Sequence, residues 1–267
     1  MAAGAAFGWL HERSKRWPFI LPYSGYSLKG SIFIITFFFL ILSGFSMQTV
    51  KRNAVWKDDL TLWSEAVFEA SSGFRAHNNL GAAYEAKGRL ELAIREYERA
   101  IAIEPGHFIT YYNLGLAYSK QGKMDLAVVN FQKSLKINPI FPLAHHGLGM
   151  AYATINEPHL AEDELREALS LDPSHLPSRR ALALLYLSME NFDQAQQVFL
   201  EVLRVQPDSL QDHMGLAIVY NQQHQFGKAI SEYDEVLRLD PRNIEAYHSL
   251  GLIFYELEKI DMAISAY

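Results

Sequence analysis

The chain has 267 residues, of which 49% are hydrophobic and 13% aromatic, and this composition is that of an ordered protein rather than a disordered tail. Its net charge of −6 at pH 7 argues against nucleic-acid binding, which rewards positive charge. Because the sequence contains no cysteine, it excludes disulfide bonds, thiolate nucleophiles and cysteine-based metal sites, and it leaves the redox state of the compartment open.

The charge divides the chain into two parts. Residues 1–57 carry seven lysines and arginines against one acidic residue, whereas residues 58–267 carry 17 against 29. Basic residues around a long apolar stretch are typical of a membrane-flanking segment. We therefore expect a basic membrane end followed by an acidic, soluble body.

The first ten residues, MAAGAAFGWL, are apolar but too few to span a bilayer. Prolines and a glycine interrupt the basic, aromatic segment that follows them. We interpret residues 1–29 as the end of a preceding membrane helix and a membrane-proximal loop.

Residues 30–50, GSIFIITFFFLILSGFSMQTV, contain no charged residue. At a rise of about 1.5 Å per residue, a helix of this length matches the ~30 Å core of a bilayer. We therefore predict a transmembrane helix over residues 30–50. A signal peptide is the alternative, but 29 residues precede the segment and no A-x-A pattern follows it.

The lysines and arginines on the two sides of this segment indicate its orientation. Four of them precede it and three follow it, which favours an internal N-terminal side. The sequence therefore predicts an integral membrane protein whose body lies in the periplasm, in the ER lumen or outside the cell.

Residues 51–73 form the junction between the predicted span and the body. Trp56, Leu60, Trp63 and Val67 are spaced by four, three and four residues, which is the pattern of an amphipathic helix. We expect this helix to cap the repeat that follows.

Prolines recur every 34 residues through the rest of the chain, and a fixed period of this size indicates a repeat array. They occur at positions 105, 139, 173, 207 and 241. The sequence divides into blocks 74–107, 108–141, 142–175, 176–209, 210–243 and 244–267. The sixth block stops at its twenty-fourth position, so we expect the chain to be a fragment or a product truncated at its C-terminus.

Four positions of each block carry the same kind of residue. The seventh is leucine, the eighth glycine or alanine, the eleventh tyrosine or phenylalanine, and the twentieth alanine. Small residues allow two helices to pack closely, and the proline at position 32 ends the second helix because it lacks an N–H. The pattern resembles the tetratricopeptide repeat (TPR). This resemblance implies an all-α solenoid, a right-handed superhelix of helix pairs at 74–86 and 90–103 and every 34 residues after.

Histidines and acidic residues are the candidate metal-binding or catalytic groups of the sequence. His77, His145 and His213 occupy the fourth position of alternate repeats, which stacking separates by about 20 Å, whereas a metal–ligand bond is ~2 Å long. We therefore favour a packing role for them. The acidic run EDELRE over 162–167 is interpreted as a solvated face paired internally with Arg166. We predict no catalytic residue, metal site or cofactor in this chain.

A solenoid of this kind offers a concave surface, lined mainly by positions 2, 5, 9 and 12 of each first helix. Asparagines at position 6 of the first two repeats resemble the start of the ladder in O-linked N-acetylglucosamine transferases. The groove predicted for a protein or peptide segment comprises Arg75, Asn78, Asn79, Tyr112, Asn113, Leu116, His146, Met150, Arg180, Leu184, Leu187, Ile218, Asn221, Leu252 and Tyr255. The alternative is that these side chains pack between neighbouring helices, and both interpretations stay open.

The junction resembles that of multispanning proteins in the transmembrane and TPR repeat-containing O-mannosyltransferase family and their bacterial relatives. The matching residues are Arg52, Trp56, Asp58, Leu62, Trp63 and residues 79–84. The resemblance implies the C-terminal, substrate-presenting part of a membrane glycosyltransferase whose catalytic acidic residue lies in an early loop outside this chain. A stand-alone membrane-tethered adaptor with no enzymatic domain is the alternative, so the question of enzymatic activity stays open.

Overall fold

The computed structural model describes residues 36–37, 39–43, 45–47, 49, 58–69 and 73–266. The chain forms two compact units, Met1–Asp58 and Asp59–Tyr267.

In the first unit, the described residues between 36 and 49 are helical. Their side chains include Phe39, Leu40 and Phe45, which are 64–70% exposed. Among the described residues, no helix has both the length and the hydropathy needed to cross a bilayer. The span predicted over 30–50 lies partly outside the described residues and the segment 1–29 lies wholly outside them.

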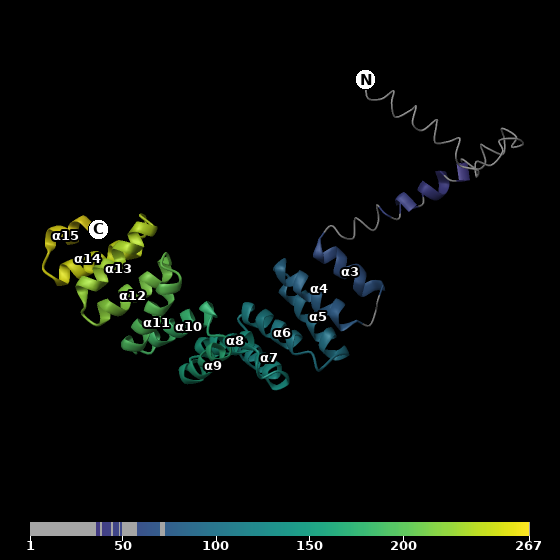
Figure 1. Cartoon of the computed structure of the whole chain (residues 1–267), viewed down its shortest axis with the longest axis horizontal. Coiled ribbons are helices and arrows are strands. Elements are labelled where there is room, and N and C mark those ends of the chain that lie inside the picture. The colour runs from purple at the N-terminus through teal and green to yellow at the C-terminus, as the bar shows by residue number, and fades with distance from the viewer. Residues whose placement is uncertain are drawn as a thin grey trace, which may run out of the picture. The chain divides into compact units, whose positions relative to one another are not determined.

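The second unit is a row of helix pairs, labelled in Figure 1. A single helix, α3 (Asp59–Glu69), precedes the pairs. The pairs are α4 (Phe74–Ala86) with α5 (Leu90–Ile103), α6 (Phe108–Lys120) with α7 (Met124–Ile137), α8 (Pro142–Thr154) with α9 (Pro158–Leu171), α10 (Leu176–Ser188) with α11 (Phe192–Val205), α12 (Leu210–Gln222) with α13 (Phe226–Leu239), and α14 (Ile244–Glu256) with α15 (Ile260–Ala266). Residues 58–69 and 73–266 contain no strand, so the predicted all-helical solenoid is confirmed.

A tight turn joins the two helices of each repeat through one residue with a positive φ at position 15. Gly88 and Gly122 supply it in the first two repeats, with φ of 71° and 74°. Glycine adopts this conformation readily, whereas other residues adopt it at an energetic cost. In the later repeats the same turn is made by Asn156, Glu190, His224 and Glu258.

A bulky side chain at position 24 packs the two helices of a repeat together. It lies against the small residue at position 8 of the first helix. A Cβ added to Gly81 would lie 2.6 Å from the Tyr97 ring, and one added to Gly115 would lie 2.7 Å from the Phe131 ring. Both rings are buried. The small residue at the eighth position is therefore required by direct contact with an aromatic ring.

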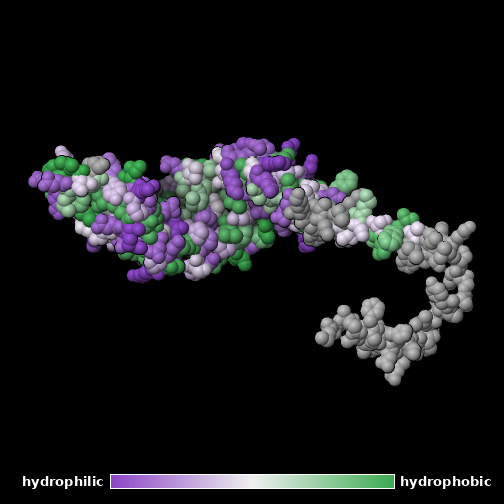
Figure 2. All heavy atoms as spheres, turned by 90° about the horizontal axis from the view of Figure 1, so that it is seen from above, coloured by the Kyte–Doolittle hydropathy of each residue, from purple (hydrophilic) through white to green (hydrophobic). Residues whose placement is uncertain are grey.

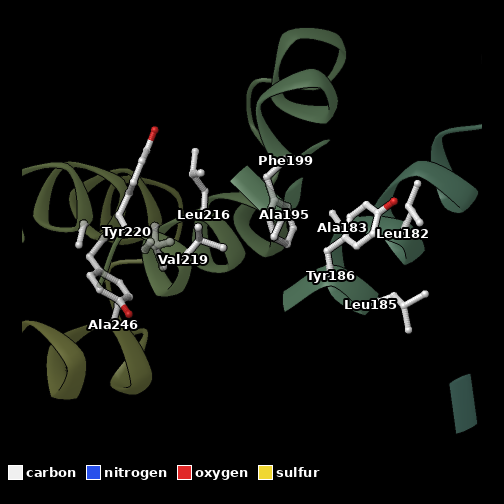
Figure 3. Packing of buried hydrophobic residues seen from close by; sticks show 14 of the residues in the cluster. Leu182, Ala183, Leu185, Tyr186, Ala195, Phe199, Leu216, Val219, Tyr220 and Ala246 are labelled. Atoms are coloured by element: carbon white, nitrogen blue, oxygen red, sulfur yellow. The ribbon is translucent and has the colours of Figure 1, made fainter. Parts of the chain in front are cut away.

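The same bulky side chain also joins neighbouring repeats. Gly147, at position 6 of the third repeat, lies against Phe131 of the second, and Gly215 lies against Phe199 in the same way. Figure 3 shows Phe199 and its neighbour Ala195 between labelled residues of α10 and α12. The hydrophobic core is thus continuous from one repeat to the next, here across α9 to α14.

The first helices of neighbouring repeats lie side by side, since α4 packs against α6, α6 against α8, α8 against α10 and α10 against α12. We call the surface formed by positions 2, 5, 6, 9 and 12 of these helices and of α14 the first-helix face. Helix α3 packs against α4, with Leu60, Trp63 and Val67 half-buried. Trp56 lies outside the described residues, and the right-handed sense of the superhelix stays a prediction.

The contact between Gly215 and Phe199 generates a prediction. Replacing Gly215 with alanine should lower the free energy of unfolding by about 1–3 kcal/mol, because the new methyl group would overlap a buried ring. The matched control is Gly227→Ala on α13, where a Cβ meets no atom within 4 Å. That change should be neutral or stabilising by up to about 1 kcal/mol. Urea unfolding followed by circular dichroism measures both, and equal stability of the two variants would contradict the packing argument.

Candidate functional site

A row of apolar side chains follows the first-helix face at position 9. Met150, Leu184 and Leu252 are 44%, 46% and 50% exposed, and Leu116 and Ile218 are half-buried. Each comes from the next first helix along the solenoid, and we call these five residues the position-9 row. Hydrophobic residues elsewhere are interspersed with hydrophilic ones on the side of the molecule seen in Figure 2.

Asparagines at the N-terminal end of this face bond to one another across two repeats. The Asn78 side-chain oxygen accepts hydrogen bonds from Thr110 Oγ1 at 3.1 Å and from Asn113 Nδ2 at 3.2 Å. Asn78 Nδ2 donates to Asn79 Oδ1 at 3.3 Å. Asn78 and Thr110 are buried, so this cluster holds α4 against α6.

His146 makes the equivalent link between α8 and α10. Its Nδ1 lies 3.0 Å from Ser178 Oγ, which also lies 2.6 Å from Nδ1 of His175. The two histidine rings are 5.1 Å apart. Burial and the neighbouring His175 lower the pKa of His146 to about 4, so its imidazole is neutral at pH 7. Protonation of His146 would place a positive charge beside the His175 ring in a partly buried contact.

Arg180 makes the corresponding link between α10 and α12 as a bidentate ion pair. Its Nε donates to Asp212 Oδ1 at 2.7 Å and its Nη2 to Asp212 Oδ2 at 2.6 Å. Asp212 is fully buried, and the Ser209 hydroxyl donates to the same carboxylate. Fork-to-fork pairs of this kind fix geometry as well as charge. Arg180 is therefore engaged within the solenoid.

Tyr112 fills position 5 of the second repeat without a polar partner of this type. Its half-buried ring lies 5.9 Å from Phe131 and 5.1 Å from Phe141, and burial raises its pKa. Arg75, by contrast, is exposed, with its guanidinium 5.5 Å from the Phe74 ring.

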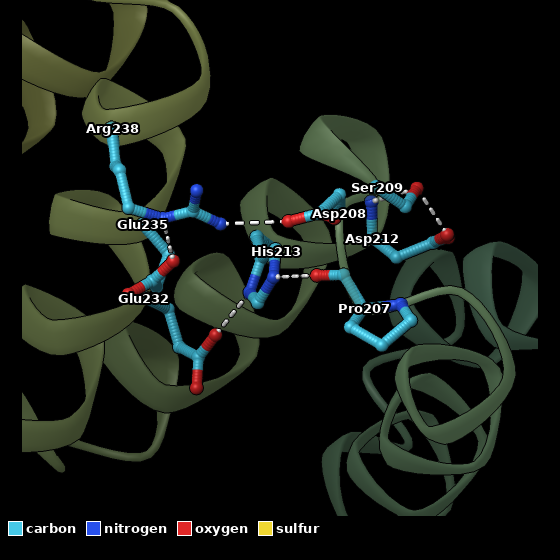
Figure 4. A network of polar contacts seen from close by, with 8 residues as sticks. All are labelled: Pro207, Asp208, Ser209, Asp212, His213, Glu232, Glu235 and Arg238. Carbon is cyan, nitrogen blue, oxygen red and sulfur yellow. Dashed lines mark hydrogen bonds and ion pairs between the residues drawn. The ribbon is translucent and has the colours of Figure 1, made fainter.

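The histidines at position 4 join the first helix of their repeat to the second, and His145 and His213 also contact the end of the repeat before. Nδ1 of His77, His145 and His213 lies 2.7, 2.6 and 2.6 Å from a glutamate of the second helix. Nε2 of His145 and of His213 lies 3.0 and 2.8 Å from the carbonyl oxygens of Pro139 and Pro207, the latter drawn in Figure 4. These rings therefore lie in the helix packing. The described residues contain no group of three or more histidines and carboxylates placed to hold a metal ion.

Two adjoining pockets open where the turn of the fourth repeat meets α12. One, of about 310 Å³, is lined by Leu187, Ser188, Glu190, Phe192, Ile218 and Gln222. The other, of about 420 Å³, is lined by Glu190, Asn191, Phe192, Asp193, Gln194 and Gln223. The first pocket includes Ile218 of the position-9 row, so it lies at the margin of the first-helix face.

Comparison with known proteins identifies the repeat. Family models described as tetratricopeptide repeat match residues 108–141 and 156–217, and one described as TPR repeat matches residues 81–122 and 217–258. The chain is a tetratricopeptide-repeat protein. Among curated proteins, Protein O-mannosyl-transferase Tmtc2 of Drosophila melanogaster is 35% identical over 68 residues. That match covers 26% of this chain and 7% of the length of Tmtc2.

Solved structures share the TPR fold. YrrB, described as a TPR protein with an unusual peptide-binding site, is 20% identical with a TM-score of 0.61 over 70% of this chain and 96% of its own. PilF of Pseudomonas aeruginosa is 20% identical with a TM-score of 0.63, over 72% and 88% of the two chains. PilW, a type IV pilus biogenesis factor, is 17% identical with a TM-score of 0.64, over 72% and 90%. At these identities the likeness is one of fold.

The structure divides the predicted groove residues of this TPR protein into two groups. Asn78, His146 and Arg180, at position 5, bond to the next repeat, and Asn113 bonds to Asn78. Tyr112, also at position 5, packs on Phe131 and Phe141 of its own repeat. The exposed residues are Met150, Leu184 and Leu252 of the position-9 row together with Arg75 and Tyr255, whereas Leu116, Ile218, Asn79, Leu187 and Asn221 are half-buried. The pairing predicted within 162–167 is present, with Arg166 Nη2 2.8 Å from Glu162 Oε1.

Of the six residues that line the pocket of about 310 Å³, Ser188, Glu190, Phe192 and Gln222 were absent from the sequence-based prediction. Glu190 lies in the turn and Phe192 begins α11, whereas the predicted groove residues occupy positions 2, 5, 6, 9 and 12 of first helices. One signal could have found Glu190: it occupies the turn position that is glycine in the first two repeats. Asn156, His224 and Glu258 hold the same position in other repeats, so this signal marks four candidates, of which Glu190 lines both pockets.

The Arg180–Asp212 pair yields a second prediction. Arg180→Met should lower the free energy of unfolding by about 3 kcal/mol, because it leaves the buried Asp212 carboxylate without its partner. Adding Asp212→Leu should recover most of the loss, because no unpaired charge remains. Urea unfolding of the two variants checks both expectations. An Arg180→Met variant as stable as the parent would show that the pair does not hold the repeats together.

Proposed function

We propose that this TPR protein is a membrane-anchored scaffold that binds an extended segment of a partner protein on its first-helix face. The position-9 row carries the proposal. Three of its five side chains, those of Met150, Leu184 and Leu252, are large and apolar and yet 44–50% exposed. They occupy the same position in repeats three, four and six. An exposed apolar row on one face is a feature of interaction surfaces.

The spacing of the row indicates the form of the bound segment. Packed helices lie about 8–10 Å apart, so neighbouring members of the row are separated by a similar distance. Three residues of polyproline II chain rise about 9 Å and return to the same side of the chain. A partner segment with an apolar residue at every third position would therefore place one side chain on each repeat.

The membrane anchor in this proposal is residues 30–50. Its support is the uncharged sequence of that segment and the exposed aromatic and aliphatic side chains among its described residues. The match to Tmtc2 supports a further proposal, that the scaffold presents acceptor protein to a membrane glycosyltransferase of which it forms a part. A tethered adaptor without an enzymatic domain is the second candidate, and the genomic sequence upstream of residue 1 distinguishes the two.

A third prediction tests the groove. Met150→Glu with Leu184→Glu should weaken the binding of peptides selected from a random library by about 30-fold or more, because recognition depends on a few buried anchors. These two residues are preferable to the half-buried Ile218, since their exposure allows substitution without loss of folding. Fluorescence anisotropy with the selected peptides, on the full chain in detergent, measures the affinity.

The matched control for this test is Leu126→Glu with Val129→Glu on the second helix α7. Both residues are 43% exposed, close to the values of Met150 and Leu184, but they lie outside the first-helix face. The control should bind the peptides as the parent does. If both double variants bind equally well, the position-9 row is not the binding surface.

A fourth prediction tests the anchor. Leu40→Arg with Leu42→Arg should move the chain from the membrane pellet to the supernatant of a carbonate wash, because each central arginine costs roughly 2.5–3.5 kcal/mol of insertion free energy. The Met150→Glu and Leu184→Glu variant should stay in the pellet. Parent protein found in the supernatant would refute the membrane anchor.

A further inference from the structure

The pocket of about 310 Å³ combines an apolar wall with one carboxylate at its rim. Leu187, Phe192 and Ile218 supply the wall, and Glu190 supplies the carboxylate. Ser188 and Gln222 complete the lining. We call it the Glu190 pocket. Leu184 and Leu187 are three residues apart on α10 and share a face of that helix, so the pocket adjoins the position-9 row.

Glu190 is one of the acidic residues of the described solenoid that have no cationic partner, although others have one. The carboxylates of Glu85, Glu96 and Glu162 each pair with a lysine or arginine. Within residues 58–69 and 73–266, no ion pair involves Glu190 or Asp193. Asp193 lines the adjoining pocket and accepts a hydrogen bond from Gln223 at 2.9 Å. The mouth of the Glu190 pocket therefore carries uncompensated negative charge.

Glu190 occupies the turn position of the fourth repeat. Its φ is 58°, whereas Gly88 and Gly122 make the same turn in the first two repeats without a backbone penalty. Asn156, His224 and Glu258 also make this turn, so a residue other than glycine is not particular to the fourth repeat. What is particular to Glu190 is that its carboxylate lines an apolar pocket.

An aliphatic chain that ends in a cation is complementary to this arrangement. The stems of lysine and arginine pack along apolar surface while their charged heads remain at a polar rim. A purely apolar side chain would leave the carboxylate unpaired, and an acidic one would meet like charge. We propose that the Glu190 pocket is the subsite for a lysine or arginine of the bound segment, next to the residue that contacts Leu184; this rests on the proposed binding on the first-helix face.

The experiment selects peptides from a random library on the full chain in detergent, and then measures one selected basic peptide and its norleucine analogue by fluorescence anisotropy. Selected peptides should be enriched in lysine or arginine at a fixed place relative to their apolar residues. Glu190→Gln should remove that enrichment and lower the affinity for the basic peptide about five- to tenfold, because a charge-assisted contact is lost. The norleucine analogue should bind the parent and the Glu190→Gln variant equally.

The matched control is Glu258→Gln. Glu258 occupies the same turn position in the sixth repeat with the same φ of 58°, and it lines neither pocket. This variant should bind the basic peptide like the parent. Circular dichroism and urea unfolding of both variants verify that the turns remain folded.

The outcomes separate this proposal from the proposed function. One outcome would overturn the Glu190 pocket alone. In that outcome the Met150→Glu and Leu184→Glu variant binds the selected peptides more weakly, whereas the Glu190→Gln variant still selects a basic residue and binds the peptides as tightly as the parent. Equal weakening by Glu190→Gln and Glu258→Gln would overturn it as well, since the effect would then be one of general charge. If the library yields no binding peptide, both proposals fall.

Discussion

The close contact between a bulky side chain on each second helix and a glycine or alanine on the first helices is the constraint on which this solenoid depends. Tyr97 and Phe131 lie against Gly81 and Gly115 within their repeats, and Phe131 also lies against Gly147 of the next repeat. One ring thus sets two distances, that between the helices of a pair and that between pairs. The regular spacing of the first-helix face follows from this double contact, and so does the spacing of the position-9 row.

The same contact is found at position 6 of the third and fifth repeats, where glycine stands in place of the asparagine of the first two. Gly147 and Gly215 stand at that position and lie directly against Phe131 and Phe199. A larger residue there would overlap the ring of the preceding repeat. The face therefore changes in character along the chain, from a hydrogen-bonded asparagine cluster in the first two repeats to exposed apolar side chains in the third and fourth.

The helices were predictable because their signals are local or strictly periodic. Prolines every 34 residues and small residues at fixed positions are visible in the sequence, and the helix pairs follow from them. The role of position 5 was not predictable in the same way. Asn78 with Thr110, His146 with Ser178, and Arg180 with Asp212 are each 32 residues apart. Only stacking of the repeats brings them together, although polar residues at position 5 followed by polar residues at position 3 of the next repeat were a usable sign. The pocket at Glu190 was harder still, since α10, the turn after it, the start of α11 and α12 all contribute to its lining.

The histidines at position 4 alternate with other residues, and the alternation extends to their partners. His77, His145 and His213 face Glu96, Glu164 and Glu232, whereas position 23 of the second and fourth repeats is Asn130 and Val198. Similar repeats carry a hazard in folding, because the first helix of one can dock on the second helix of its neighbour. Such a mismatch would set a histidine against an amide or an isopropyl group and leave a glutamate without its imidazole. The alternation of histidine–glutamate pairs therefore favours the packing of these first helices on the second helices of their own repeats over packing on those of a neighbouring repeat.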